Sequence, residues 1–373
     1  MAGKDAIVAE PILPLAYLVS FAFLMGAIIG SFLNVLIHRV PRGESIVSPG
    51  SRCPSCGNAI RPADNVPLVS FLFLRGRCRA CGEKISWRYP LVELATAVIF
   101  AAIVWKTGPT IDAVLEMIFS AGLVALILID ARDHLLPNVI TYPLFLYVLL
   151  AAAWRAGWGA PIGYPLDFSI VFSTAETGFP AGRSAIVGGI LIALAAPGFW
   201  LMDRIDLLLF NKYFDWEEAE GTDSGAEEEI ERRHDRTIYG TMILGLLCGV
   251  CWAWLFWRHG AADPPAYAEA AAGLRGAVAG ALVGSLPLWW LRAAYFYLRG
   301  SEGMGLGDVK LVAIIGGFLG WQGALSTLLL GSIAGSVAGI ILMRRSGDRL
   351  KTVLPFGCFL GLAALVVLFK QFL

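Results

Sequence analysis

The sequence predicts an all-α polytopic membrane protein, a bundle of about ten transmembrane helices with a small cytoplasmic tetracysteine zinc module. Hydrophobic residues make up 57% of the chain and charged residues only 16%. The mean hydropathy is +0.69. These values exceed what a soluble globular chain keeps solvated. The third observation is a series of apolar segments, each long enough to cross a bilayer.

Ten apolar segments have the length and composition of a membrane span. They occupy residues 15–37, 90–106, 111–130, 139–154, 184–202, 238–257, 275–298, 309–320, 322–343 and 353–372. A tight turn is expected at Gly320, between the eighth and ninth segments. Lys4 is the only basic residue before the first segment. We therefore interpret that segment as a retained span rather than a signal peptide.

The basic residues orient the spans. Between the first two spans Arg and Lys strongly outnumber Asp and Glu, and the positive-inside rule assigns such a segment to the cytoplasm. The basic residues between spans nine and ten require the same side, as ten alternating spans demand. The predicted organisation is an N-terminal region with the first span (1–37), a cytoplasmic zinc-binding module (38–89) and a transmembrane core (90–373).

A second hydrophilic segment, residues 203–237, contains twelve acidic and five basic residues. An acidic block of this kind buries too little apolar surface to fold alone. We interpret it as a solvated cytoplasmic spacer. The formal net charge of zero identifies no partner, and no nucleic acid is expected.

Four cysteines in the predicted cytoplasmic module form two C-x-x-C pairs. Cys53 and Cys56 are separated from Cys78 and Cys81 by twenty-one residues, and a glycine follows each pair. This spacing is typical of a structural zinc site, in which four thiolates complete a tetrahedron and leave no position for catalysis. Disulfides are the alternative, but thiols in the cytoplasm stay reduced.

Two aspartates lie at the ends of predicted spans. Asp130 ends the third span, and Asp308 opens the eighth. A carboxylate in or near hydrocarbon is costly and calls for a functional explanation, although a charge at a helix end can also reach the interface. Four spans lie between them, an even number, so both are expected at the cytoplasmic end. Paired carboxylates can perform aspartic proteolysis, one as base on water and one as acid toward the scissile carbonyl.

The segment before Asp308 is rich in glycine. Gly303, Gly305 and Gly307 occupy alternate positions and permit a backbone approach that other residues prevent. We expect Gly305 and Gly307 to form an active-site loop that admits the substrate backbone. Lys310 follows closely, and we expect it to favour the ionised form of one carboxylate.

Several motifs closely resemble those of the type IV prepilin peptidases, a family of membrane aspartic peptidases marked by a Gly-x-Gly-Asp motif. That motif matches residues 305–308 within a longer match at 303–311. The other matches are residues 30–42, the four cysteines, and residues 64–67, 76–79, 85–93 and 130–137. Together these ordered motifs extend over residues 26–145 and 275–365.

The resemblance implies a bifunctional enzyme. Such an enzyme cleaves the short basic leader from prepilins and pseudopilins after a glycine, and then methylates the new N-terminal amine with S-adenosylmethionine. Asp130 and Asp308 would be the catalytic pair, and the four cysteines would bind zinc. The resemblance also implies a multi-pass protein of the bacterial inner membrane, with its active site at the cytoplasmic face and pilus or type II secretion components as partners.

The chain departs from the family pattern at two residues and in its number of spans. Arg132 stands where members often have a second aspartate, and Asn138 stands where Leu-Pro-Asp is more usual. More spans than usual separate the aspartates. We therefore interpret residues 183–257 as an inserted helix pair with its acidic loop.

Three other functions compete with this reading of the sequence. The nearest is a peptidase without the methyltransferase step, although relatives of that kind lack the cysteine module. An ion-coupled transporter could bind cations at the two aspartates, and an inverted repeat containing both would favour it. A zinc-anchored scaffold for pilus assembly would tolerate the loss of both aspartates.

Overall fold

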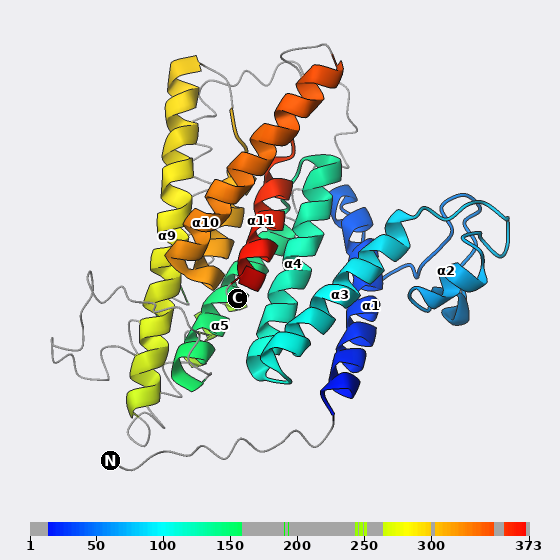
Figure 1. Cartoon of the computed structure of the whole chain (residues 1–373), viewed down its shortest axis with the longest axis horizontal. Helices are drawn as coiled ribbons and strands as arrows, with labels where there is room; N and C mark the ends of the chain where they lie inside the picture. The colour runs from blue at the N-terminus through cyan, green and yellow to red at the C-terminus, as the bar shows by residue number, and fades with distance from the viewer. Residues whose placement is uncertain are drawn as a thin grey trace. The chain divides into compact units, whose positions relative to one another are not determined.

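A computed structural model describes residues 14–158, 264–299, 303–346 and 354–370, with isolated helical residues between 190 and 251. In these ranges the chain is almost entirely helical, as predicted. Figure 1 shows α1 (Leu15–Arg39), α2 (Val69–Phe73), α3 (Arg88–Thr107), α4 (Ile111–Asp133), α5 (Asn138–Trp158), α9 (Pro264–Arg299), α10 (Leu306–Ser346) and α11 (Phe356–Lys370).

Six of the described helices are long and apolar enough to cross a membrane, and α11 is a shorter apolar helix. The expected turn at Gly320 lies inside α10, where this residue has φ 74° and ψ 174° and two helical segments meet. The segments expected at 184–202 and 238–257 lie outside the described residues, apart from isolated helical positions. The multi-span helical fold is therefore confirmed, and the number ten stays a prediction.

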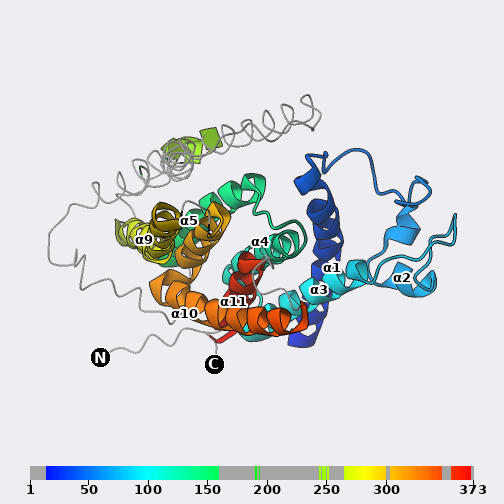
Figure 2. The same ribbon diagram turned by 90° about the horizontal axis from the view of Figure 1, so that it is seen from above.

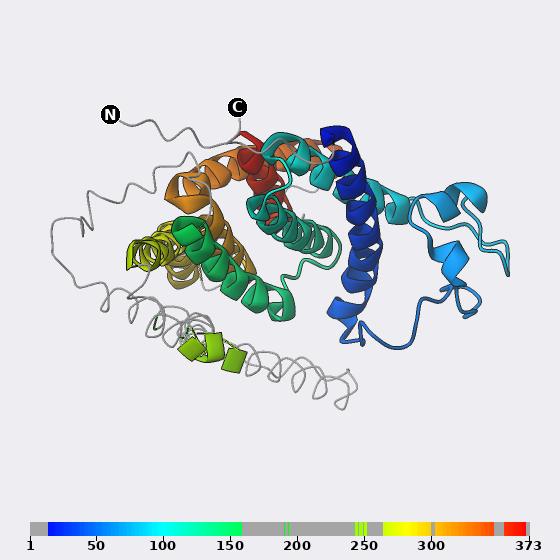
Figure 3. The same ribbon diagram turned by 90° about the horizontal axis from the view of Figure 1, so that it is seen from below.

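The chain divides into two compact units, Met1–Leu36 with Ile46–Ala121, and Ile37–Ser45 with Gly122–Leu373. In the first unit, α1 packs closely against α3. A Cβ atom on Gly30 would lie 2.7 Å from the Cα of Glu93. One turn further, the Asn34 amide donates to the Tyr89 carbonyl at 3.1 Å. Small residues of this kind let helix backbones meet in a membrane, and Figure 3 shows α1 (dark blue) beside the start of α3 (cyan).

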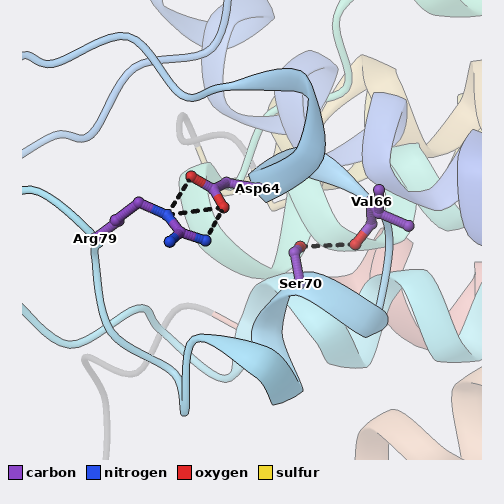
Figure 4. Close-up of polar contacts among 4 residues, drawn as sticks. All are labelled: Asp64, Val66, Ser70 and Arg79. Carbon is purple, nitrogen blue, oxygen red and sulfur yellow. Dashed lines mark hydrogen bonds and ion pairs between the residues drawn. The ribbon is translucent and has the colours of Figure 1, made fainter.

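A salt bridge joins two segments of the module between α1 and α3. Arg79 Nη2 lies 2.6 Å from Asp64 Oδ1, and Arg79 Nε also donates to this carboxylate (Figure 4). The guanidinium lowers the pKa of Asp64, mainly through this hydrogen bond. Nearby, the Ser70 hydroxyl donates to the Val66 carbonyl at 2.6 Å.

In the second unit, α10 packs against α5, α9 and α11, and α5 packs against α9. Figure 2 shows α11 and α10 next to one another in this group. Gly280 on α9 faces Gly316 on α10, and a Cβ atom on either residue would collide with the carbonyl oxygen of the other. Only glycine fits at both positions, so the two backbones are in direct contact.

Candidate active site

The two aspartates meet at the start of α11. A Cβ atom on Gly357 would lie 3.0 Å from Asp130 Oδ2 and 3.0 Å from Asp308 Oδ1. The two oxygens are therefore at most twice 3.0 Å apart. Asp130 lies near the C-terminal end of α4, and Asp308 lies in the first turn of α10. Their exposed fractions are 5% and 8%, so the pair is buried.

The N-terminus of α11 also binds Asp130 directly. The backbone N–H of Cys358 donates to Asp130 Oδ2 at 2.7 Å. Because α11 begins at Phe356, this N–H is one of the helix donors that have no partner within the helix. The positive end of the helix dipole faces the carboxylate.

The sequence analysis did not identify Gly357 or Cys358 as residues of the site. The signal in the sequence was a proline at 355, near the start of the predicted span 353–372, with a glycine two residues after it. Proline and small residues at a helix start indicate an N-terminus whose backbone donors face outward. They do not indicate which side chain accepts hydrogen bonds from those donors.

Gly305 and Gly307 in the glycine loop have different surroundings. A Cβ atom on Gly307 would lie 2.8 Å from the Cβ of Leu136, a residue in the connection between α4 and α5. A Cβ atom on Gly305 would approach only the backbone nitrogen of Gly307, at 3.9 Å. Gly307 therefore permits the close approach of the segments after Asp130 and before Asp308, whereas Gly305 borders open space.

Arg292 on α9 holds the same loop from the other side. Its side chain is only 4% exposed, and its Nε donates to the Met304 carbonyl at 3.0 Å. The neighbouring Gly303 packs against the ring of Tyr295, where a Cβ atom would lie 2.5 Å from Cδ1. Arg292 and Tyr295 are three residues apart and so lie on one face of α9. The sequence analysis missed Arg292, which lies inside the predicted span 275–298 and about two turns before the end of α9.

Lys310 is buried and follows Asp308 by two residues, but its side chain extends toward α5. Its Nζ donates to Asn138 Oδ1 at 2.7 Å and lies 5.3 Å from the centre of the Tyr142 ring. The amide of Asn138 is neutral and does not cancel the ammonium charge as a carboxylate would. The expected effect of Lys310 on the carboxylates stays a prediction.

The four cysteines converge in the first unit. Their sulfur atoms all lie within 4.8 Å of one another, and the Cys53 and Cys81 sulfurs are 3.9 Å apart. A tetrahedral site with metal–sulfur bonds of about 2.3 Å places sulfurs about 3.8 Å apart, so the cluster fits zinc. Each pair lies on a tight hairpin that ends at a glycine with positive φ, 71° at Gly57 and 74° at Gly82.

The thiols differ in acidity. Backbone hydrogen bonds from Cys56 and then Ser55 lower the pKa of Cys53 to about 6. A backbone hydrogen bond at Glu83 acts in the same direction on Cys81, but desolvation and the neighbouring sulfurs outweigh it and raise the pKa of Cys81 to about 12. One thiolate forms readily, and further negative charge needs a cation to balance it. This is the chemistry that a bound zinc ion supplies.

Two sequence families match this chain. The bacterial peptidase A24 N-terminal domain matches residues 24–107, the range that contains the four cysteines. The type IV leader peptidase family matches residues 234–340, the range that contains Asp308 and its glycine loop.

Curated relatives match nearly the whole chain. A protein of Pseudomonas aeruginosa is 28% identical, over 95% of this chain and 91% of its own length. One from Pseudomonas putida is 27% identical over 93% and 89%, and one from Aeromonas hydrophila is 29% identical over 94% and 89%. Each is named prepilin leader peptidase/N-methyltransferase. No solved structure matches the chain.

Proposed function

Because this chain belongs to the type IV leader peptidase family, we propose that it removes the leader peptide from type IV prepilins or pseudopilins and methylates the new N-terminal residue. The observation that carries the peptidase assignment is the convergence of two buried carboxylates at Gly357. Two carboxylates at such a distance can share the acid and base roles that peptide hydrolysis needs.

Asp130 and Asp308 take different roles in this proposal. A hydrogen bond from the Cys358 N–H favours the ionised carboxylate of Asp130. Asp130 is therefore the base, which takes a proton from the attacking water. Asp308 is the acid, which protonates the oxygen of the scissile carbonyl as water adds to the carbon. When the carbon–nitrogen bond of the tetrahedral intermediate breaks, the leaving amine takes the proton held by Asp130, and Asp308 regains its proton from a hydroxyl of the intermediate.

The loop at 303–307 admits the substrate. Gly305 leaves open space beside the backbone, so an extended peptide can lie along it and reach Asp308. Arg292 and Leu136 hold the two sides of the loop. Lys310 contributes a nearby positive charge that favours an ionised carboxylate in the pair.

Methyl transfer is a separate reaction. The new N-terminal amine attacks the methyl carbon of S-adenosylmethionine, the sulfur–carbon bond breaks, and the amine loses a proton. This needs a positioned amine and donor rather than two carboxylates. We place it in the region of residues 30–42 and the zinc module, in which Cys53, Cys56, Cys78 and Cys81 hold a structural zinc ion and maintain the shape of the module.

The proposed setting is the bacterial inner membrane. The basic segments predict that the zinc module and the aspartates face the cytoplasm. Prepilins and pseudopilins are the substrates, and pilus or type II secretion assembly components are expected partners. The acidic loop at 203–237 would extend into the same compartment.

Co-expression with a candidate prepilin tests both reactions at once. The mass of the recovered pilin should fall by the leader and rise by one methyl group. A pilin that is cleaved but unmethylated would indicate a peptidase alone. A pilin that keeps its leader, when enzyme and substrate are both inserted in the membrane, would contradict the proposed function.

A further inference from the structure

The zinc module carries an exposed apolar surface on α2. Val69, Leu72 and Phe73 are 48%, 73% and 82% exposed, and we call these three residues the α2 tip. Their spacing of three and four residues places them on one side of the helix. A cluster of exposed apolar side chains of this kind indicates a binding surface.

Packing and a hydrogen bond on the opposite side of α2 fix the orientation of the α2 tip. Phe71 packs against Trp87, with ring centroids 4.8 Å apart, and Gly76, at φ 65°, lies directly against the Phe71 ring. At the start of α2, the N–H of Leu68 donates to the buried Glu93 carboxylate at 2.8 Å. The outward direction of Leu72 and Phe73 is therefore built into the module.

Exposed basic residues follow the tip. Arg75 and Arg77 come directly after α2, and Arg88 begins α3. An apolar side next to a group of arginines is the composition of segments that lie in a membrane interface. Anionic headgroups complement the arginines, and acyl chains cover the apolar side chains.

The position of α2 in the first unit favours the same partner. Figure 1 shows α2 to one side of α1, and Figure 2 shows the same sideways displacement. Both ends of the module continue into helices long enough to span the membrane. The bilayer is therefore always close to the tip, at a high effective concentration.

We propose that the α2 tip inserts into the lipid interface, with Leu72 and Phe73 among the acyl chains and Arg75 and Arg77 against anionic headgroups. This docking depends on the membrane spans alone and not on the proposed enzymatic reactions. It fixes the zinc module on the bilayer surface rather than free in solution.

Photocrosslinking tests the proposal on the full-length protein. Phe73→p-benzoylphenylalanine in vesicles of phosphatidylethanolamine and phosphatidylglycerol should, after irradiation, give adducts with the mass of a phospholipid. Ala80→p-benzoylphenylalanine is the matched control, an exposed position between two of the cysteines. It should give several-fold fewer lipid adducts. Zinc content and leader cleavage report that each variant is folded.

Lipid charge gives the second comparison. Replacing phosphatidylglycerol by phosphatidylcholine should lower the adduct yield several-fold. Arg75→Gln with Arg77→Gln should lower the insertion equilibrium about fivefold per charge removed, since each basic side chain near an anionic surface contributes about 1 kcal/mol. Leu72→Ser with Phe73→Ser should increase hydrogen exchange across 66–77 in vesicles.

Four results would overturn the proposal. They are the absence of lipid adducts at position 73, an equal yield at position 80, an adduct with a second copy of the chain, and loss of the lipid adduct when a pilin is added and crosslinks in its place. The last result would assign the tip to the substrate instead of the bilayer.

Discussion

The cysteine cluster and the aspartate pair differ in what holds them together. Cys56 and Cys81 are exposed, and each hairpin closes through local backbone bonds, such as Cys53 N–H to the Asn58 carbonyl at 3.0 Å. Asp130 is buried and bonds to Cys358, a residue far away in the sequence. The geometry of the cluster therefore depends on short local loops, whereas the aspartate pair depends on the packing of α4, α10 and α11, which are distant in the sequence. Changes to the two sites should therefore have separable effects.

The largest effect is expected at the aspartates. Asp130→Asn or Asp308→Asn should each lower leader cleavage by about a hundred- to ten-thousandfold, because an amide cannot exchange the required proton. Either variant should still methylate a pilin supplied without its leader, as measured by mass. Asp133→Asn, an acid at the end of the same helix, is the control and should cleave normally. Full processing by either variant would show that the substituted aspartate is not catalytic.

Loss of a bound zinc ion should affect the zinc module rather than the aspartate pair. Metal analysis of the purified protein should give about one zinc ion per chain, by the count of four thiolate ligands. Cys53→Ser with Cys56→Ser should lose the zinc, increase hydrogen exchange in residues 51–60 and 76–85, and impair methylation more than cleavage. Stoichiometric zinc in this double variant would contradict the assignment. Equal loss of both activities would show that the two regions are not independent.

Gly357→Ala tests how tightly packing defines the aspartate pair. The new methyl group would lie 3.0 Å from a carboxylate oxygen of each aspartate and should displace at least one of them. We expect about a hundredfold slower cleavage, the typical cost of a small misplacement of reacting groups. Gly335→Ala on α10 is the control, because its Cβ atom would make ordinary contacts at 3.6 Å or more. Normal cleavage by the Gly357 variant would show that the site tolerates a shift.

A smaller effect is expected from Arg292→Met. The loop would lose a charged hydrogen-bond donor to the Met304 carbonyl, a bond worth about 1.5 kcal/mol or roughly tenfold in rate. The loss should appear in kcat for cleavage more than in KM, while methylation of a pre-cleaved pilin stays unchanged. Arg299→Met, at the exposed end of the same helix, should leave kcat unchanged. A fall in methylation as well would indicate a general folding defect.

The smallest effect is expected from Asp64→Asn. Because the guanidinium of Arg79 lowers the pKa of Asp64, the salt bridge stabilises the module at pH values above the ordinary carboxyl pKa. This contribution is lost as the pH falls through the lowered pKa. Exposed pairs contribute little, so the unfolding temperature at neutral pH should hardly change, with any difference from the parent protein disappearing in acid. A large loss of zinc in this variant would assign the salt bridge a greater structural role.

The sequence predicted those features that depend on local composition or on counting. Apolar segments of sufficient length predicted the described spans, and Gly320 predicted the break in α10. The C-x-x-C spacing predicted the four-sulfur cluster. The even number of predicted spans between Asp130 and Asp308 predicted that both lie at the same end of the bundle. Each inference needs only the length of a helix or the reach of a short loop.

The tertiary structure decided which backbone and side-chain groups complete the site. Gly357 and Cys358 lie in an ordinary apolar segment, and only the packing of α11 brings them to the aspartates. Arg292 lies within an apolar span, and only the packing of α9 places its side chain beside the glycine loop. The physical reason is that such contacts depend on helix rotation and depth. Helix rotation and depth result from many contacts between small residues that are distant in the sequence. No local sequence pattern therefore predicts them.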